Sequence, residues 1–255
     1  MDIVKATVLY LSGTGTTEKY ARAFAEGLPY DVEVVPLRHD EEPPCEFGSD
    51  ELLVLAVPVF AGYAPKFVWE RLAHMRGSHT PCALLAVYGA RDYDNALHEM
   101  DERLTAKGFR TIGAAALVAR HSIAQTVAPD RPSASDLAQT REFADEVAAR
   151  IGALGSIDDA SAFSFKTVEV HLGTNVYPRA SDACIECGTC ASECPAGAIP
   201  ADEPSSTDNE TCISCLRCIE VCPVGARSLP DGLIDRVTAM LAHEGADPAK
   251  PNEFF

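Results

Sequence analysis

The sequence has few basic residues, and this shortage limits the partners it can bind. It contains 21 Lys and Arg against 38 Asp and Glu, a net charge of −17. Between residues 181 and 230, only Arg217 and Arg227 oppose eight acids. Nucleic-acid phosphates are bound by Lys and Arg, so this composition argues against a nucleic-acid partner. It favours docking to basic patches on redox partner proteins, although solubility alone explains an acidic surface equally well.

Long apolar runs are also missing. No stretch approaches the roughly 20 apolar residues that a membrane-spanning helix requires, so we expect no membrane span. The first residues, MDIVKATVLYLSGTG, lack the small-residue cleavage pattern of a secretory leader. Together these absences predict a cytoplasmic protein in a reducing compartment.

Cysteine, by contrast, is concentrated in one short part of the chain. Eight of the ten cysteines form two runs of the pattern Cys-x2-Cys-x2-Cys-x3-Cys-Pro, the first starting at Cys184 and the second at Cys212. This spacing is that of a two-cluster bacterial ferredoxin, in which each run gives three thiolates to one 4Fe–4S cubane and the fourth to the other. One cluster is therefore assigned to Cys184, Cys187, Cys190 and Cys222, and the other to Cys212, Cys215, Cys218 and Cys194.

Zinc and disulfide bonds are the alternatives for these cysteines. Paired Cys-x2-Cys elements occur in zinc sites, but zinc does not explain a third cysteine and a Cys-Pro ending in each run. Disulfides need an oxidising compartment, for which the sequence gives no sign. Two other cysteines lie outside any ligand spacing, and Cys82 is expected to be a small buried residue of a strand.

Short apolar runs alternate with helical patterns through the first 154 residues. The runs predict strands at residues 6–11, 31–36, 51–57, 81–88 and 110–119. The helical spacings predict helices at residues 18–28, 66–76, from 94 to about 107, and 133–154. This alternation indicates a doubly wound, five-stranded parallel sheet, which binds ligands beyond the carboxyl ends of its strands.

Three loops fall at those carboxyl ends. The first joins a strand to a helix and combines hydroxyls with glycines, in Ser12, Gly13, Thr14, Gly15, Thr16 and Thr17. Backbone N–H groups at a helix N-terminus bind phosphate, and a loop without lysine suits a terminal monophosphate. A turn that merely caps the helix is the alternative.

The second and third loops offer aromatic rings and glycines, which suit stacking on a flat ring and a close backbone approach. The second holds Pro58, Val59, Phe60, Ala61 and Gly62, and the third holds Gly89, Arg91 and Tyr93. Phe60 and Tyr93 are the favoured stacking residues, with core filling as the alternative for each. Trp69 is expected in the core. His121 is expected to be an ordinary surface or hydrogen-bonded histidine, with a place near the flavin edge or the ferredoxin domain as the alternative.

The stretches SGTGTTEKYARAFAEGL, VPVFAGYAPKF and VYGARDYDNAL, followed by the doubled cysteine run, resemble the ferredoxin–flavodoxin fusion family of anaerobic bacteria and archaea. The resemblance implies a flavodoxin-like domain that binds FMN, followed by a small α+β ferredoxin domain with two 4Fe–4S clusters. Phe60 stands where tyrosine is common in that family, a substitution that keeps a stacking ring.

The resulting expectation is a flavodoxin-like domain at residues 1–154, a linker at 155–180, a ferredoxin domain at 181–230, and a C-terminal helix and tail at 231–255. The function expected from it is electron relay between the clusters and FMN. A flavoenzyme that reduces a small molecule is the alternative, and an exchanged homodimer stays open. No second nucleotide fingerprint and no evident substrate domain is visible, and both absences favour the relay.

Overall fold

Five parallel strands form the centre of the structure, a computed structural model that describes residues 1–170 and 176–255. They are β1 (Lys5–Tyr10), β2 (Asp31–Pro36), β4 (Glu51–Pro58), β6 (Thr80–Tyr88) and β7 (Phe109–Val118), side by side in the order β2-β1-β4-β6-β7. The central strands are buried on both faces, which is why they are continuous apolar runs in the sequence. The five expected strands and the doubly wound α/β class are confirmed.

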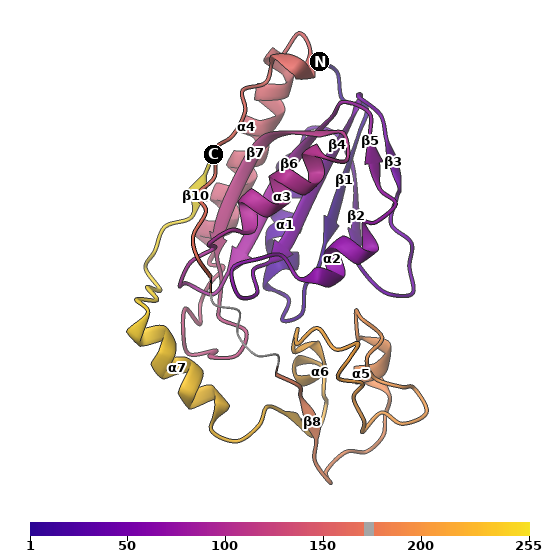
Figure 1. Cartoon of the computed structure of the whole chain (residues 1–255), viewed down its shortest axis with the longest axis vertical. Helices are drawn as coiled ribbons and strands as arrows, with labels where there is room; N and C mark the ends of the chain where they lie inside the picture. The colour runs from indigo at the N-terminus through magenta and orange to yellow at the C-terminus, as the bar shows by residue number, and fades with distance from the viewer. Residues whose placement is uncertain (171–175) are drawn as a thin grey trace.

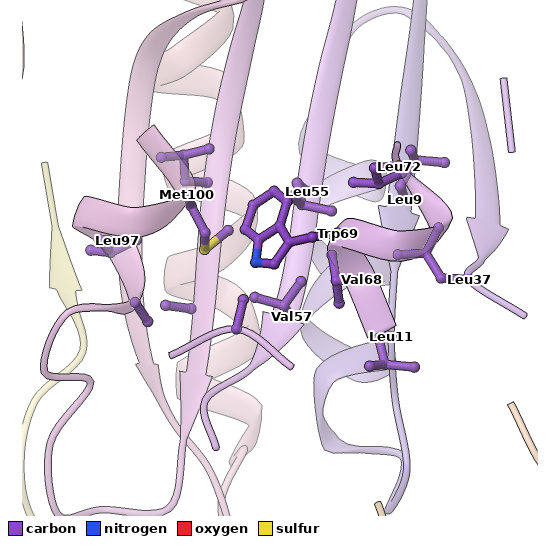
Figure 2. Packing of buried hydrophobic residues seen from close by; sticks show 14 of the residues in the cluster. Leu9, Leu11, Leu37, Leu55, Val57, Val68, Trp69, Leu72, Leu97 and Met100 are labelled. Atoms are coloured by element: carbon purple, nitrogen blue, oxygen red, sulfur yellow. The ribbon is translucent and has the colours of Figure 1, made fainter. Parts of the chain in front are cut away.

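Helices cover both faces of this sheet (Figure 1). α1 (Thr16–Gly27) and α4 (Ala134–Ala153) lie on one face, where Phe24 and Phe143 meet edge to face at 5.9 Å. α2 (Lys66–Arg71) and α3 (Ala96–Thr105) cover the other face. Trp69 packs there beside Met100 and over Leu55 (Figure 2), so its expected place in the core is confirmed. The sheet and these helices, residues 1–154, are called the α/β domain below.

The second helix is shorter than the sequence predicts. α2 ends at Arg71, and residues 76–77 instead form β5 (Arg76–Gly77), which pairs with β3 (Glu46–Phe47) in a separate two-stranded sheet. The Thr80 hydroxyl is 2.9 Å from the Phe47 carbonyl oxygen and 2.8 Å from that of Gly48. These side-chain contacts hold the segment after α2 against the loop before β4, and a local helical pattern does not reveal them.

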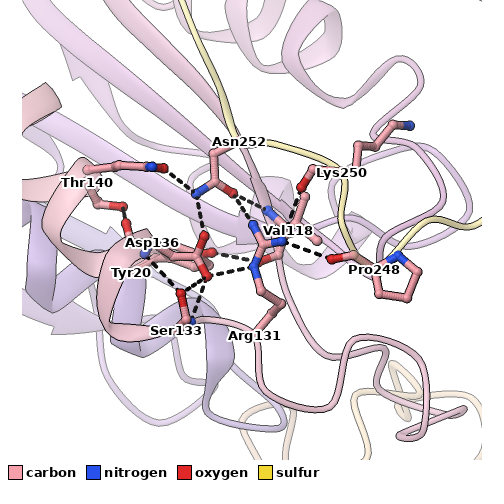
Figure 3. Close-up of polar contacts among 10 residues, drawn as sticks. Tyr20, Val118, Arg131, Ser133, Asp136, Thr140, Pro248, Lys250 and Asn252 are labelled. Carbon is pink, nitrogen blue, oxygen red and sulfur yellow. Dashed lines mark hydrogen bonds and ion pairs between the residues drawn. The ribbon is translucent and has the colours of Figure 1, made fainter.

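A sixth strand comes from the C-terminal tail, for which the sequence carries no strand pattern. β10 (Glu253–Phe254) runs antiparallel to β7, with Glu253 opposite Ala116. Arg131 ties the tail down (Figure 3): it donates to the carbonyls of Pro248 and Lys250, each at 3.1 Å, and to Asp136 Oδ2 at 2.6 Å. The tail therefore completes the sheet of the α/β domain.

The cysteine-rich domain, residues 179–230, is held together by β8 (Arg179–Ala180) and β9 (Arg227–Ser228), which pair antiparallel. Its two short helices, α5 (Thr189–Ser192) and α6 (Arg217–Glu220), each carry the third cysteine of a run. The 3-10 helix η1 (Ile157–Asp159) precedes this domain, and α7 (Leu233–His243) follows it. The chain thus leaves the α/β domain, forms the cysteine-rich domain and returns (Figure 1). None of the helices in the described ranges is long and apolar enough to cross a membrane.

Candidate functional site

The loop between β1 and α1 presents hydrogen-bond donors that no described part of the chain uses. α1 begins after Gly15, which has φ 83° and gives no side-chain cap. Ser12 Oγ accepts from the Glu18 amide at 3.2 Å and so orders the turn. Among the described residues, no acceptor is seen for the amides of residues 13–17 or for the hydroxyls of Thr14, Thr16 and Thr17. This donor set fits the phosphate of a mononucleotide.

A cavity of about 60 Å³ lies beside this loop. Its lining combines the three strand-end loops with the start of the segment after β7 and one cysteine: Gly13, Thr14, Thr16, Thr17, Pro58, Val59, Phe60, Val87, Tyr88, Gly89, Ala119, Arg120, His121, Ser122 and Cys215. Ligand pockets are typically several hundred Å³, so a flavin ring needs more room than this closed arrangement leaves. The cavity places the donors of the phosphate loop beside Phe60, Gly89 and His121.

The loop after β4 contributes its first half to the cavity. Phe60 and Tyr63 form an isolated antiparallel bridge, which tightens the turn between them. The two residues inside that turn have positive φ, 47° at Ala61 and 82° at Gly62, and they lie outside the cavity lining. The Gly62 carbonyl accepts from the Asn95 amide at 3.0 Å. Phe60 is therefore the aromatic side chain of this loop that faces the cavity.

The loop after β6 divides between the cavity and the opposite side. Gly89 lines the cavity, but Tyr93 is buried away from it. Lys166 Nζ lies 3.8 Å from the centre of the Tyr93 ring, and the Tyr93 hydroxyl pairs with Glu253 at 3.2 Å. Arg91 pairs with Asp94. Segments far away in the sequence thus occupy the ring face that was expected to stack on a flavin.

His121 lies in the cavity lining together with Cys215, the less favoured of the two positions that the sequence left open. Its Nδ1 accepts from the amides of Ile123 at 3.2 Å and Ala124 at 3.0 Å, so the ring proton lies on Nε2. Burial, with a smaller contribution from the charge of Arg91, lowers the pKa of His121 to about 4. A Cβ on Gly89 would lie 2.5 Å from His121 Cδ2, so the glycine makes room for the ring. The result is a neutral hydrogen-bond donor beside the phosphate loop.

The eight cysteines of the two runs lie in the cysteine-rich domain, and none of them forms a disulfide bond with a described residue. Cys215 is close enough to Cys194, Cys218 and Cys212 for their charges to interact, which brings together the four cysteines assigned to one cluster. Cys187 interacts in the same way with Cys222 of the other assigned set. The described residues hold no group of three or more His, Cys, Asp or Glu side chains placed for a single metal ion.

The donor chemistry of these thiols fits iron–sulfur clusters. The Ala198 amide donates to Cys194 Sγ at 3.3 Å, and the Ala226 amide, at the equivalent position of the second run, donates to Cys222 Sγ at 3.2 Å. Amide hydrogen bonds to sulfur are one of the means by which proteins set cluster potentials. Burial raises the pKa of the Cys215 thiol to about 12, and a bound metal centre would supply positive charge that favours its thiolate. Burial likewise gives Cys82 a pKa of about 12, and its expected place inside a strand is confirmed.

The cysteine-rich domain docks on the phosphate-loop end of the α/β domain. A Cβ on Gly13 would lie 2.0 Å from the Cys215 carbonyl oxygen, so the two backbones are in direct contact. The His39 amide donates to the Pro195 carbonyl at 2.7 Å, and Arg38 Nη2 donates to that of Ser192 at 2.7 Å. The phosphate loop near the start of the chain and the second cysteine run near its end therefore form one site.

Comparisons with known proteins agree with this division. The family model described as flavodoxin matches residues 8–160, and the model described as a 4Fe-4S dicluster domain matches residues 183–226. The comparison with curated proteins gave no match.

Solved structures resemble the α/β domain. A flavodoxin from the domain Archaea is 18% identical over 58% of this chain and 99% of its own, with a TM-score of 0.43. The flavodoxin of Streptococcus pneumonia TIGR4 is 20% identical over 58% and 99%, with a TM-score of 0.44. An azoreductase from Bacillus anthracis str. Sterne is 10% identical over 56% and 100%, with a TM-score of 0.42. Because the flavodoxin model covers more than half of the sequence, the chain belongs to the flavodoxin family, and its flavodoxin domain is followed by a 4Fe–4S dicluster domain.

Proposed function

We propose that this redox protein relays electrons between two 4Fe–4S clusters and FMN, and so couples one-electron to two-electron carriers. The observation that carries the proposal is the contact between Cys215 and Gly13. It sets a cluster ligand against the loop whose free donors suit a phosphate. An electron carrier needs its cluster and its flavin close together, which this contact would provide. It needs no separate substrate domain.

The amides of residues 13–17 and the hydroxyls of Thr14, Thr16 and Thr17 would hold the FMN phosphate, with Ser12 ordering the turn. Bound FMN supplies a centre that accepts either one or two electrons. Phe60 lines the cavity and would offer its ring to the flavin. Replacing Thr14 and Thr16 by Glu should abolish FMN binding by charge repulsion; unchanged flavin content in that variant would exclude this loop as the phosphate site.

The two clusters have different places in the relay. The cluster of Cys194, Cys212, Cys215 and Cys218 adjoins the α/β domain, because Cys215 lies against Gly13 and lines the cavity. The cluster of Cys184, Cys187, Cys190 and Cys222 lies on the far side, where Cys187 is exposed. We therefore assign electron exchange with FMN to the cluster that Cys215 ligates. Exchange with external partners is assigned to the cluster that Cys187 ligates.

Reduction of a small molecule at the flavin is the second candidate function, and His121 favours it. This neutral Nε2–H donor lies in the same cavity as Phe60 and Gly89 and has no role that the relay requires. Both candidate functions need the flavin in this cavity, so they differ only in whether a small molecule is reduced there. A screen of small oxidants against the reduced holoprotein separates the two, because a reductase turns over one of them in a saturable way and a relay does not.

Anaerobic purification and stopped-flow reduction test the relay. Two cubanes require about eight iron atoms per chain, with the charge-transfer absorbance of iron–sulfur clusters. After chemical reduction of the clusters, flavin reduction should follow at a rate independent of protein concentration. A rate proportional to concentration would mean exchange between molecules and would refute the internal relay. We place this chemistry in the cytoplasm, where reducing conditions preserve the thiolates.

A further inference from the structure

The two cysteine runs fold into the same backbone, so the cysteine-rich domain presents two equivalent surfaces. Equivalent residues of the two runs share the uncommon left-handed conformation: Glu186 and Ser214 have φ 53° and 57°, Gly188 and Leu216 have 75° and 65°, and Gly197 and Gly225 have 71° and 63°. The short helices α5 and α6 occupy equivalent positions as well. Whatever surface one run offers for docking, the other run offers too.

We call residues 213–216 with 195–197 the inner face and residues 185–188 with 223–225 the outer face. The inner face is covered by the α/β domain: Ala196 is 6% exposed and packs into its core, where Ile213 also packs. The equivalent residues of the outer face are open. Val224, equivalent to Ala196, is 45% exposed, and Ile185, equivalent to Ile213, is 61% exposed.

The same contrast holds for the cluster ligands. Cys215 of the inner face is buried and its carbonyl meets Gly13, whereas its equivalent, Cys187, is exposed. Ile185 and Val224 occupy the positions equivalent to Ile213 and Ala196, both of which pack against the core of the α/β domain. The apolar residues of the inner face place one cluster against the α/β domain. The outer face repeats these apolar positions around the other cluster, where no described part of the chain covers them.

Charge decides the kind of partner. Glu186 is exposed in the outer face, and Asp182 is exposed three residues before Ile185; neither forms an ion pair with a described residue. The two arginines of the cysteine runs point elsewhere: Arg217 pairs with Glu193 at 2.6 Å, and Arg227 is buried and donates to the carbonyls of Pro204 and Ser206. Arg179 of β8 is exposed as well, so the surroundings of the outer face carry two acidic side chains and one basic side chain, a net negative charge.

We propose that the outer face is the docking site for a protein electron carrier with a cationic surface around its redox centre. The proposal rests on the proposed relay and locates where the relay meets its partner. In the complex, one electron leaves the reduced outer cluster and reduces the one-electron carrier; no bond or proton changes. Apolar contact at Ile185 and Val224 brings the centres together, and Asp182 and Glu186 orient the cationic partner.

Binding of oxidised cytochrome c, a small haem protein with a strongly cationic surface, tests the face without electron transfer. The oxidised holoprotein and two double variants are titrated calorimetrically at low and at physiological ionic strength. Asp182→Lys with Glu186→Lys should raise Kd about tenfold or more at low salt, and the difference should shrink as salt screens the charges. Ile185→Ser with Val224→Ser should weaken binding at both ionic strengths. Iron content confirms in each variant that both clusters are present, and Asp182→Lys alone serves if Glu186→Lys loses a cluster.

Glu142→Lys with Asp145→Lys is the matched control, because it reverses two exposed charges on α4 of the α/β domain, away from the cysteine-rich domain (Figure 1). Equal weakening in this control would overturn the proposal, because binding would then depend on net charge alone. Unchanged binding in both outer-face variants would also overturn it. So would a wild-type dimer that dissociates in these variants, because the outer face would then bind a second copy of the chain. Flavin reduction within the same samples is measured separately: its absence alongside selective binding would refute the relay and leave the docking face standing.

Discussion

The contact between Gly13 and Cys215 makes Gly13→Ala the sharpest test of how the domains are joined. The added Cβ would lie 2.0 Å from the Cys215 carbonyl oxygen, whereas ordinary contacts begin at 3.4 Å. The two backbones must therefore move apart until the ordinary separation is restored. The obstructing atom belongs to a backbone, so no side-chain rotation can relieve the clash.

The expected magnitude follows from the overpacked contact. Overpacking of a tight contact costs about 1–3 kcal/mol. The unfolded-state freedom of glycine does not enter, because the α/β domain is folded in both the docked and the undocked states. The docked arrangement should therefore lose about 1–3 kcal/mol. Because about 1.4 kcal/mol corresponds to tenfold in an equilibrium constant, the undocked population should rise about tenfold or more.

Hydrogen exchange of the His39 amide measures this population directly, because that amide donates to the Pro195 carbonyl across the interface at 2.7 Å. In the holoprotein of Gly13→Ala, the exchange rate of His39 should rise about tenfold or more while the amides of the central strands keep their protection. Gly15→Ala is the matched control in the same loop. Its Cβ would meet nothing within 4 Å, although its φ of +83° strains an alanine.

Two results would refute the reasoning. Unchanged exchange at His39 in Gly13→Ala would mean that the phosphate loop and the Cys215 turn are not in contact. Equal acceleration in Gly15→Ala would mean that strain within the loop, rather than the interface, causes the effect. Flavin content, measured in both variants, separates a change in docking from a change in cofactor binding.

Three further predictions concern the tail network and the cavity. Arg131→Met should lower the free energy of unfolding by about 3 kcal/mol in urea titrations, because it leaves the buried Asp136 carboxylate without its cationic partner. Arg141→Met breaks only a surface ion pair and should lower it by less than about 1 kcal/mol. Burial alone would raise the pKa of Asp136, but hydrogen bonds from Ser133 and Arg131 outweigh it and lower the pKa. Stability should therefore fall as pH drops below the ordinary aspartate pKa of about 3.9, and Asp136→Asn should flatten that limb of the stability curve. Since burial lowers the pKa of His121 to about 4, nitrogen NMR should show its ring still neutral at pH 5, with the proton on Nε2. A doubly protonated ring at that pH would contradict the assigned hydrogen bonds. In the unfolded state His121 takes up a proton near pH 6.5, so it reduces the free energy of unfolding as pH falls from about 6.5 towards 4.

The sheet and the cysteine runs were predictable because their signals are local. A strand such as β4 is a continuous apolar run with both faces buried, and each cysteine run repeats a spacing set by cluster geometry. β10 was not predictable, because two residues are too few for a periodic pattern and the strand depends on Arg131 and β7 for its place.

The candidate site was predictable loop by loop but not as an assembly. The sequence places Phe60 and Tyr93 in strand-end loops, yet the side to which each ring turns depends on distant residues. Lys166 and Glu253 hold Tyr93 away from the cavity. His121 becomes a defined donor only because the chain turns back to direct two amides at Nδ1. Cys215 reaches Gly13 through docking of surfaces, which no sequence window contains.

The return of the tail as β10 has a consequence for how the protein is made. Glu253 pairs with Ala116 of a strand made much earlier, so a ribosome delivers the last strand of the sheet only after the whole cysteine-rich segment has emerged. Until then, the edge of β7 is an unpaired template for other chains. The clusters can be assembled while that edge is still open, and closure of the sheet then fastens the second end of the cysteine-rich domain. A gene cut after residue 230 would therefore yield an α/β domain with an exposed edge strand and a tendency to aggregate, rather than two separable carriers.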